Sequence, residues 1–152
     1  MLKIINFNSQ NFLKKLENIL NKRKSNQKSK TASVSKIIFN VKKNNIFLMQ
    51  LNRFMWEDVE KGVFRKNKRI RTILKFENVL EVYSKNINQS KKDKFLDFLA
   101  IESSTMPDNN YEMKIIFAGD SIIKIVSEVI EVTLDDQGEA WDTKNKPKHK
   151  TI

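Results

Sequence analysis

The chain has 152 residues, with 29 Lys and Arg against 18 Asp and Glu, so its formal net charge is +11. A chain of this length forms one domain with a real core, and 39% hydrophobic residues distinguish it from disordered chains. It has no Cys and one His, which excludes disulfides, thiolate metal sites and Cys nucleophiles and leaves little room for zinc or triad chemistry. Composition and motifs therefore do not define a function.

The positive charge is mostly Lys, which is typical of AT-rich codon usage. Arg is the residue preferred for bidentate phosphate and base contacts, so the total charge is weak evidence for nucleic-acid binding. Residues 1–45 carry eleven basic residues and one acidic residue, whereas 95–142 carry two and eleven. These two regions either neutralise each other in one fold or form separate docking faces.

A helix is predicted over about 10–22, where the apolar residues form one stripe: Phe12, Leu13, Leu16, Ile19 and Leu20. Residues 22–33 are predicted to be a mobile basic linker, because they contain no apolar residue larger than Ala32. After the linker, apolar residues recur at every second position, which is the spacing of a strand. They are Ile37 and Phe39 on one predicted strand and Phe47, Met49 and Leu51 on the next. This alternation predicts a hairpin around Lys43, Asn44 and Asn45.

Further strands are predicted over 69–76, 79–84, 95–102, 111–117 and 122–134, the last of them bent near Ser127. The first two are separated at Glu77 and Asn78, and Leu80 is expected to point inward. The predicted fold is α+β, with the N-terminal helix packed on a curved, mostly antiparallel sheet of six or seven strands. A small barrel and a pleckstrin-homology-like sheet both fit. Residues 1–142 form the predicted domain, and 143–152 form a basic tail.

A family resemblance rests on three segments, which are 51–57 (LNRFMWE), 116–119 (IFAG) and 134–143 (LDDQGEAWDT), together with Pro147 to His149. Over nearly the whole chain they resemble the bacterial family catalogued as domain of unknown function 2948. The resemblance implies one globular domain, with an N-terminal helix, alternating strands and a Pro-x-His tail, and it implies no known activity. The chain departs from the family pattern at Asp120, where members commonly have Gly, in its abundance of Lys and in its longer polar linker.

Polar and aromatic residues gather where one predicted strand ends, and strand-end loops often display functional groups. An Arg beside Trp and carboxylates can clamp an anionic ligand or a peptide. The predicted partner-binding residues are Asn52, Arg53, Trp56, Glu57, Trp141 and His149. The structural alternative is an ion pair between Arg53 and Glu57, with Trp56 closing one end of the sheet.

Four carboxylates lie within eight residues at Asp135, Asp136, Glu139 and Asp142. Their spacing does not match an EF-hand, so we expect a solvated acidic turn and no metal site. His149 stands among Lys residues without a partner for catalysis, and the three Gly are isolated, which argues against a nucleotide-phosphate loop. We therefore expect no cofactor.

The sequence predicts a non-catalytic cytosolic binding module that recognises a protein partner. The cytosolic location follows from the lack of a signal-peptide core or a long apolar run. The alternative is non-specific binding of RNA or single-stranded DNA through basic segments 22–30 and 65–75, with candidate residues Arg65, Lys66, Lys68, Arg69 and Arg71. An enzymatic hypothesis rests only on scattered carboxylates such as Glu57, Asp58, Glu128 and Glu131.

Overall fold

The computed structural model describes residues 4–7, 10–20, 32–40, 45–55, 68–87 and 96–142. Within these ranges the chain forms one helix and nine strands. In chain order they are β1 (Ile4–Phe7), α1 (Gln10–Leu20), β2 (Ser33–Asn40), β3 (Ile46–Phe54), β4 (Lys68–Phe76), β5 (Val79–Lys85), β6 (Leu96–Thr105), β7 (Tyr111–Phe117), β8 (Ser121–Ser127) and β9 (Val132–Asp142). Of the linker predicted over 22–33, residues 22–31 lie outside the described residues, as does the tail over 143–152. The linker prediction was wrong at its end, because Ala32 is buried and β2 begins at Ser33.

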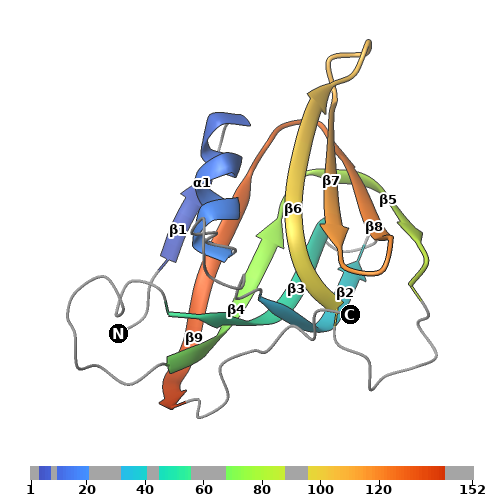
Figure 1. Cartoon of the computed structure of the whole chain (residues 1–152). Coiled ribbons are helices and arrows are strands. Elements are labelled where there is room, and N and C mark those ends of the chain that lie inside the picture. The colour runs from blue at the N-terminus through green and yellow to red at the C-terminus, as the bar shows by residue number, and fades with distance from the viewer. Residues whose placement is uncertain are drawn as a thin grey trace.

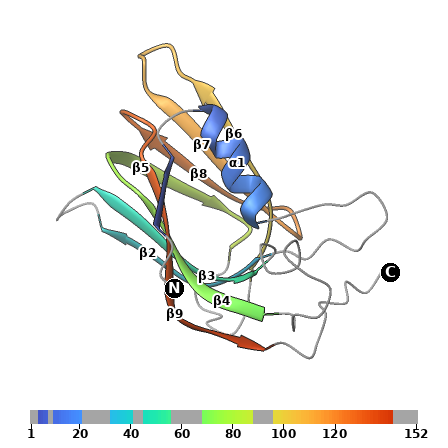
Figure 2. The same cartoon turned by 90° about the vertical axis from the view of Figure 1, so that its left-hand side faces the viewer.

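The strands form a single antiparallel sheet in the order β1-β9-β4-β3-β2-β6-β7-β8-β5. In this spatial order, the first five strands form one half of the sheet and the last four form the other. The two halves join where Val34 of β2 pairs with Leu96 of β6. Figures 1 and 2 show the sheet curling so that its two halves face each other. The end strands β1 and β5 are not paired with each other in the described part, so the sheet does not close there.

A corner connects the two halves on their other side, where β4 passes into β5 and β8 passes into β9. The backbone N–H of Glu77 donates to the backbone carbonyl of Glu131 at 3.0 Å. The side-chain amide of Asn78 donates from Nδ2 to the Glu131 carboxylate at 2.9 Å. Asn78 has a φ of 55°, a conformation that Asn tolerates better than most residues. The predicted interruptions at Glu77 and Asn78 and near Ser127 are therefore confirmed as one shared bend.

One hydrophobic core fills the space between the two halves. The alternation in β3 is confirmed, because Phe47, Met49 and Leu51 are all buried. From the opposite half the core takes residues of β6, β7 and β8, including Phe98, Met113, Ile115, Ile123 and Ile125. Leu80 does not join this core, since a register shift between Val79 and Glu81 makes it an extra residue and leaves it 37% exposed. The inward orientation expected of Leu80 was wrong.

The helix covers the region where β6 leaves β2 (Figure 2). Its predicted stripe is confirmed at Leu13, Leu16 and Leu20, which are buried in the common core. The side chain of Glu17 accepts a hydrogen bond from the backbone N–H of Ile101 on β6 at 3.3 Å. The helix thus buries apolar surface and also provides an acceptor for β6 beyond the stretch where β6 pairs with β2.

The chain is mostly sheet, with nine strands instead of the six or seven expected, so the α+β description holds only in outline. The difference arises because β1 is too short for its periodicity to be recognised, and because the strand expected over 122–134 is divided into β8 and β9, with the acidic segment after Leu134 continuing β9. The β7–β8 turn has positive φ at Gly119 and Asp120, and Asp can adopt this conformation in place of the more usual Gly. Within the described residues, no helix is both long and apolar enough to span a membrane.

Candidate functional site

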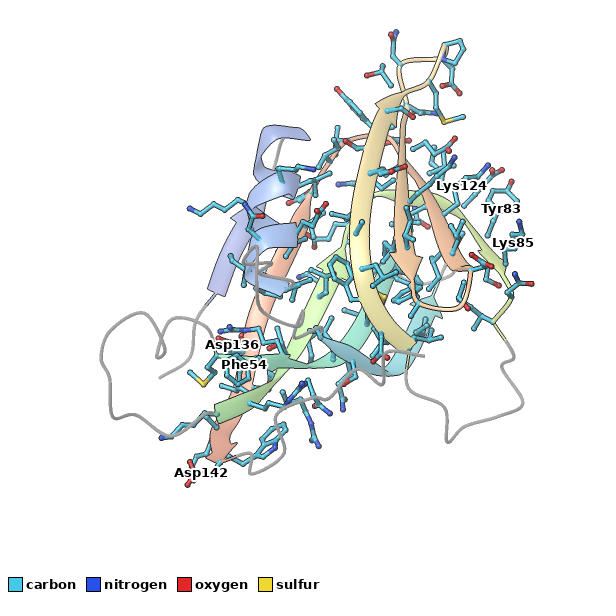
Figure 3. The ribbon with its side chains drawn as sticks, in the orientation of Figure 1. Phe54, Tyr83, Lys85, Lys124, Asp136 and Asp142 are labelled. Carbon is cyan, nitrogen blue, oxygen red and sulfur yellow. The ribbon has the colours of Figure 1, made fainter. Side chains whose placement is uncertain are left out.

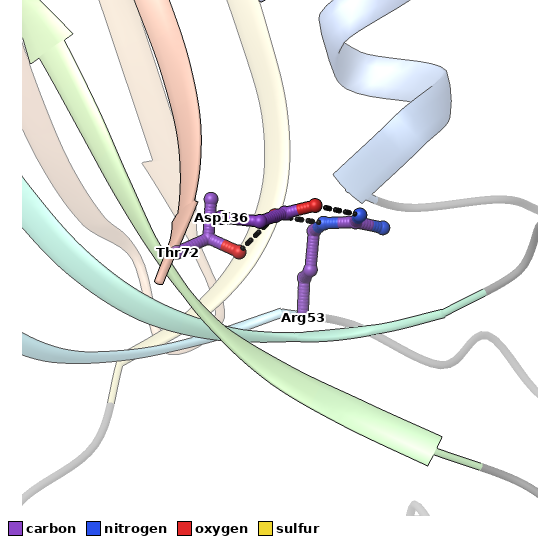
Figure 4. A network of polar contacts seen from close by, with 3 residues as sticks. All are labelled: Arg53, Thr72 and Asp136. Atoms are coloured by element: carbon purple, nitrogen blue, oxygen red, sulfur yellow. Dashed lines mark hydrogen bonds and ion pairs between the residues drawn. The ribbon is translucent and has the colours of Figure 1, made fainter. Parts of the chain in front are cut away.

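A polar network lies inside the sheet on three adjacent strands (Figure 4). Arg53 on β3 donates from Nε to Oδ1 of Asp136 at 2.9 Å and from Nη2 to Oδ2 at 2.6 Å. Thr72 on β4 donates its hydroxyl to the same carboxylate at 2.8 Å. All three side chains are buried, at 0% exposure for Arg53 and Thr72 and 2% for Asp136. The bidentate geometry and the added hydroxyl compensate the desolvation of the two charges.

The two-residue period explains why these polar side chains point inward. Arg53 continues the inward series of β3 after Leu51, and Asp136 continues that of β9 after Leu134. The expectation of a solvated acidic turn was wrong, because this segment is a strand and Asp136 faces the core. Within the described residues, Arg53 forms its ion pair with Asp136. The structural alternative had paired Arg53 with Glu57, which lies outside the described residues.

The opposite face of the same three strands carries a different set of side chains, which we call the outer strip. It consists of Asn52, Arg69, Arg71, Gln137 and Trp141. Arg71 is in register with Asn52 on one side and Gln137 on the other, and Arg69 is in register with Trp141. Arg71 is exposed and Trp141 is 40% exposed, so the strip presents a cation and an indole ring to solvent.

Arg69 links two strands at the end of the outer strip. Its Nη1 donates to the backbone carbonyl of Asn52 at 3.2 Å. Burial lowers the pKa of the Arg69 guanidinium, and the carboxylate of Asp97 opposes this shift. An arginine with a lowered pKa is still cationic at neutral pH. Arg69 therefore supplies a fixed positive charge beside the more exposed Trp141.

A bulge in β9 sets the position of Trp141. Between the pairs Arg71–Gln137 and Arg69–Trp141, β9 contains more residues than β4, and the register shifts. Gly138 lies in this bulge with a φ of 68°, a backbone conformation that favours glycine. The two extra residues place Trp141, instead of Glu139, opposite Arg69 and leave it on the outer face.

The carboxylates of the acidic segment do not converge on a metal site in the described part of the chain. Asp135 and Asp136 are neighbours on a strand and therefore project from opposite faces. The carboxylate of Asp136 is already occupied by Arg53 and Thr72. Asp142, at the end of β9 (Figure 3), is in register with Lys68 of β4.

A family model described as "Protein of unknown function (DUF2948)" matches residues 26–149. The chain belongs to the DUF2948 family. The match contains the Arg53 network and all of the outer strip, whereas β1 and α1 precede it. No curated protein and no solved structure matches the chain.

In this DUF2948 fold, the residues singled out from the sequence separate into three groups. Asn52 and Trp141, expected to bind a partner, come together with Arg69 and Arg71, which were nucleic-acid candidates. Arg53, expected to be displayed beside Asn52, instead points into the core. A third group, comprising Trp56, Glu57, His149, Arg65 and Lys66, lies outside the described residues.

Sequence reasoning missed Thr72, Asp136 as an internal partner, and Gln137. The alternation contained the signal for the first two, since Thr72 falls at a core position of β4 between Ile70 and Leu74, and Asp136 falls at a core position of β9 after Leu134. No local signal identified Gln137, whose role depends on which strand lies next to β9.

Proposed function

We propose that this DUF2948 protein is a non-catalytic binding module that recognises a protein partner through the outer strip. The single observation that carries the proposal is the register of Trp141 with Arg69, next to the exposed Arg71. Trp and Arg dominate the binding energy of many protein interfaces, because they combine large contact area with directional hydrogen bonds. The proposal keeps the cytosolic location expected from the sequence.

A hydrogen-bonded network beneath the strip supports this role. Arg53, Thr72 and Asp136 join β3, β4 and β9 on the inner face, directly behind the outer strip. A surface supported in this way loses little conformational freedom when a partner binds. The Arg53 network then holds the binding surface in place and does not itself contact the partner.

The test compares the wild-type protein with a Trp141→Ala/Arg71→Ala variant. Crosslinking in cell extract identifies candidate partners, and titration with the purified partner then measures affinity. We expect about a 30-fold loss of affinity, as for truncation of a central interface residue. Val129→Ala is the control, because Val129 is 47% exposed and lies between β8 and β9, away from the outer strip. Unchanged affinity in a folded Trp141→Ala/Arg71→Ala variant would exclude the outer strip.

A second candidate function is binding of single-stranded nucleic acid at the same strip. Arg69 and Arg71 lie on the same face of β4 beside the partly exposed ring of Trp141, an arrangement suited to phosphates and a stacked base. A salt titration with a fluorescent oligothymidine tests this candidate, because phosphate contacts make affinity fall steeply with salt. Arg71→Ala should reduce the salt slope by about one. Absence of binding at low salt eliminates the candidate.

A further inference from the structure

The last strand of the sheet has an edge that no other strand of the described chain occupies. β5 pairs with β8 along one side, and β5 is the terminal strand of the sheet order. Three of its side chains, Glu81, Tyr83 and Lys85, alternate along the strand and are all exposed. An exposed strand edge is a template for pairing with another strand.

Tyr83 is held in the middle of this row. Its hydroxyl donates to Oε2 of Glu81 at 2.5 Å, and Nζ of Lys124 on β8 lies 4.9 Å from the centre of its ring. Figure 3 shows Tyr83, Lys85 and Lys124 together on the outer side of these two strands. Tyr83 is nevertheless 51% exposed, so an ordered aromatic ring faces solvent at the sheet edge.

The row of three side chains is complementary to a second copy of itself. In an antiparallel pairing centred on Tyr83, Glu81 of one protomer stands opposite Lys85 of the other, and Lys85 stands opposite Glu81. The two Tyr83 rings then meet at the two-fold axis. Opposite charges and aromatic pairs at facing positions of antiparallel strands stabilise the pairing, whereas like charges destabilise it.

We propose that the β5 edge mediates homodimerisation, joining two copies of the sheet through residues 81–85. Charge complementarity selects a second copy of this chain as the occupant, because the sequence Glu-Val-Tyr-Ser-Lys reverses its charge order when read from the opposite direction. The interface is isologous, as a two-fold dimer requires. The proposal is independent of the outer strip, which lies on β3, β4 and β9.

The pairing is short, and this limits the stability of the dimer. The register shift between Val79 and Glu81 makes Leu80 an extra residue, so regular pairing can begin only at Glu81. A contact of five residues a side belongs to the class of small, transient interfaces. The dissociation constant of the dimer should therefore lie between about 1 and 500 μM.

Sedimentation velocity over this concentration range tests the proposal on the full chain. The wild type should shift from monomer to dimer. Glu81→Lys and Lys85→Glu should each weaken self-association by about tenfold or more, because each variant places like charges opposite one another. An equimolar mixture of the two variants should form a heterodimer, since the charges are then complementary again.

Three results would overturn the proposal. The first is a wild type that stays monomeric at every concentration, which would leave the β5 edge to a foreign strand or to no partner. The second is a wild-type dimer that neither charge variant weakens. The third is a mixture of two folded variants that fails to restore association. The Lys85→Glu variant keeps the contacts of Tyr83 with Glu81 and Lys124. Weaker self-association of this variant therefore cannot be attributed to a displaced Tyr83 ring.

Discussion

Arg53 and Asp136 lie 83 positions apart in the chain, yet their side chains form a bidentate ion pair across β4. Both are buried, so neither charge can recover its hydration if the other is removed. Such a pair contributes little compared with an apolar pair of similar volume, but it is costly to break on one side only. This asymmetry makes the pair sensitive to single substitutions.

Asp136→Asn should therefore lower the free energy of unfolding by about 3–5 kcal/mol, because Arg53 is left as a buried charge without a carboxylate. Equilibrium unfolding in urea measures the change. Asp135→Asn is the control, since Asp135 lies next in sequence on the other face, and its effect should stay within about 0.5 kcal/mol. Equal effects of the two substitutions would contradict a special role for the pair.

Replacing both partners tests the same argument in the opposite direction. The Arg53→Met/Asp136→Leu variant removes both charges and keeps much of the buried volume. It should lose less stability than Asp136→Asn alone, because no unpaired charge remains. Urea unfolding of the single and double variants side by side gives the answer, and a double variant less stable than Asp136→Asn would refute the argument.

Thr72 completes the network, and Thr72→Val should cost about 1–2 kcal/mol of unfolding free energy through loss of its hydrogen bond to Asp136. The valine has nearly the same shape, so packing is largely preserved. In the Asp136→Asn background, the same substitution should have a different cost, with a coupling of about 0.5 kcal/mol or more. Additive effects in this double-mutant cycle would show that the hydroxyl does not act through the carboxylate.

The sequence predicted the parts of the fold that depend on neighbouring residues. The alternation of Phe47, Met49 and Leu51 correctly assigned the inner face of β3, and the stripe of α1 assigned its buried side. Asn45 and Asn78, which the sequence marks as a turn and an interruption, both adopt positive φ. In each case a local preference and the final fold agree.

The candidate site was predicted only in part, because it depends on strand order. Placing Asn52, Arg71 and Gln137 in one row requires β4 to lie between β3 and β9, which periodicity does not reveal. Register shifts add a second difficulty, since one extra residue changes the direction in which the following side chains point. This effect explains the exposed Leu80, whereas the two extra residues of β9 keep the alternation and change only which residue, Trp141, stands opposite Arg69.

Glu17 should stabilise the fold as a hydrogen-bond acceptor for the Ile101 amide, more than as a charge. Its ion pair with Lys14 spans 3.9 Å, and the Lys14 side chain is 76% exposed, so the pair contributes little. Glu17→Ala should cost about 1 kcal/mol and reduce hydrogen-exchange protection at Ile101, while Glu17→Gln keeps an acceptor and should be nearly neutral. Equal losses in both variants would assign the effect to the ion pair instead.

Tyr83 should ionise at a higher pH than an ordinary tyrosine. The hydrogen bond to Glu81 raises the pKa of the Tyr83 phenol above 10.0, and the negative charge of that carboxylate raises it further. Because the folded state favours the neutral phenol, this contribution to stability is present below the ordinary pKa and is lost as pH rises through the folded pKa. Ultraviolet titration of a Tyr111→Phe variant isolates Tyr83, since the chain has two Tyr. Adding Glu81→Gln removes the carboxylate charge and should move the titration toward lower pH. An unchanged titration would mean that Glu81 does not hold the phenol in its neutral form.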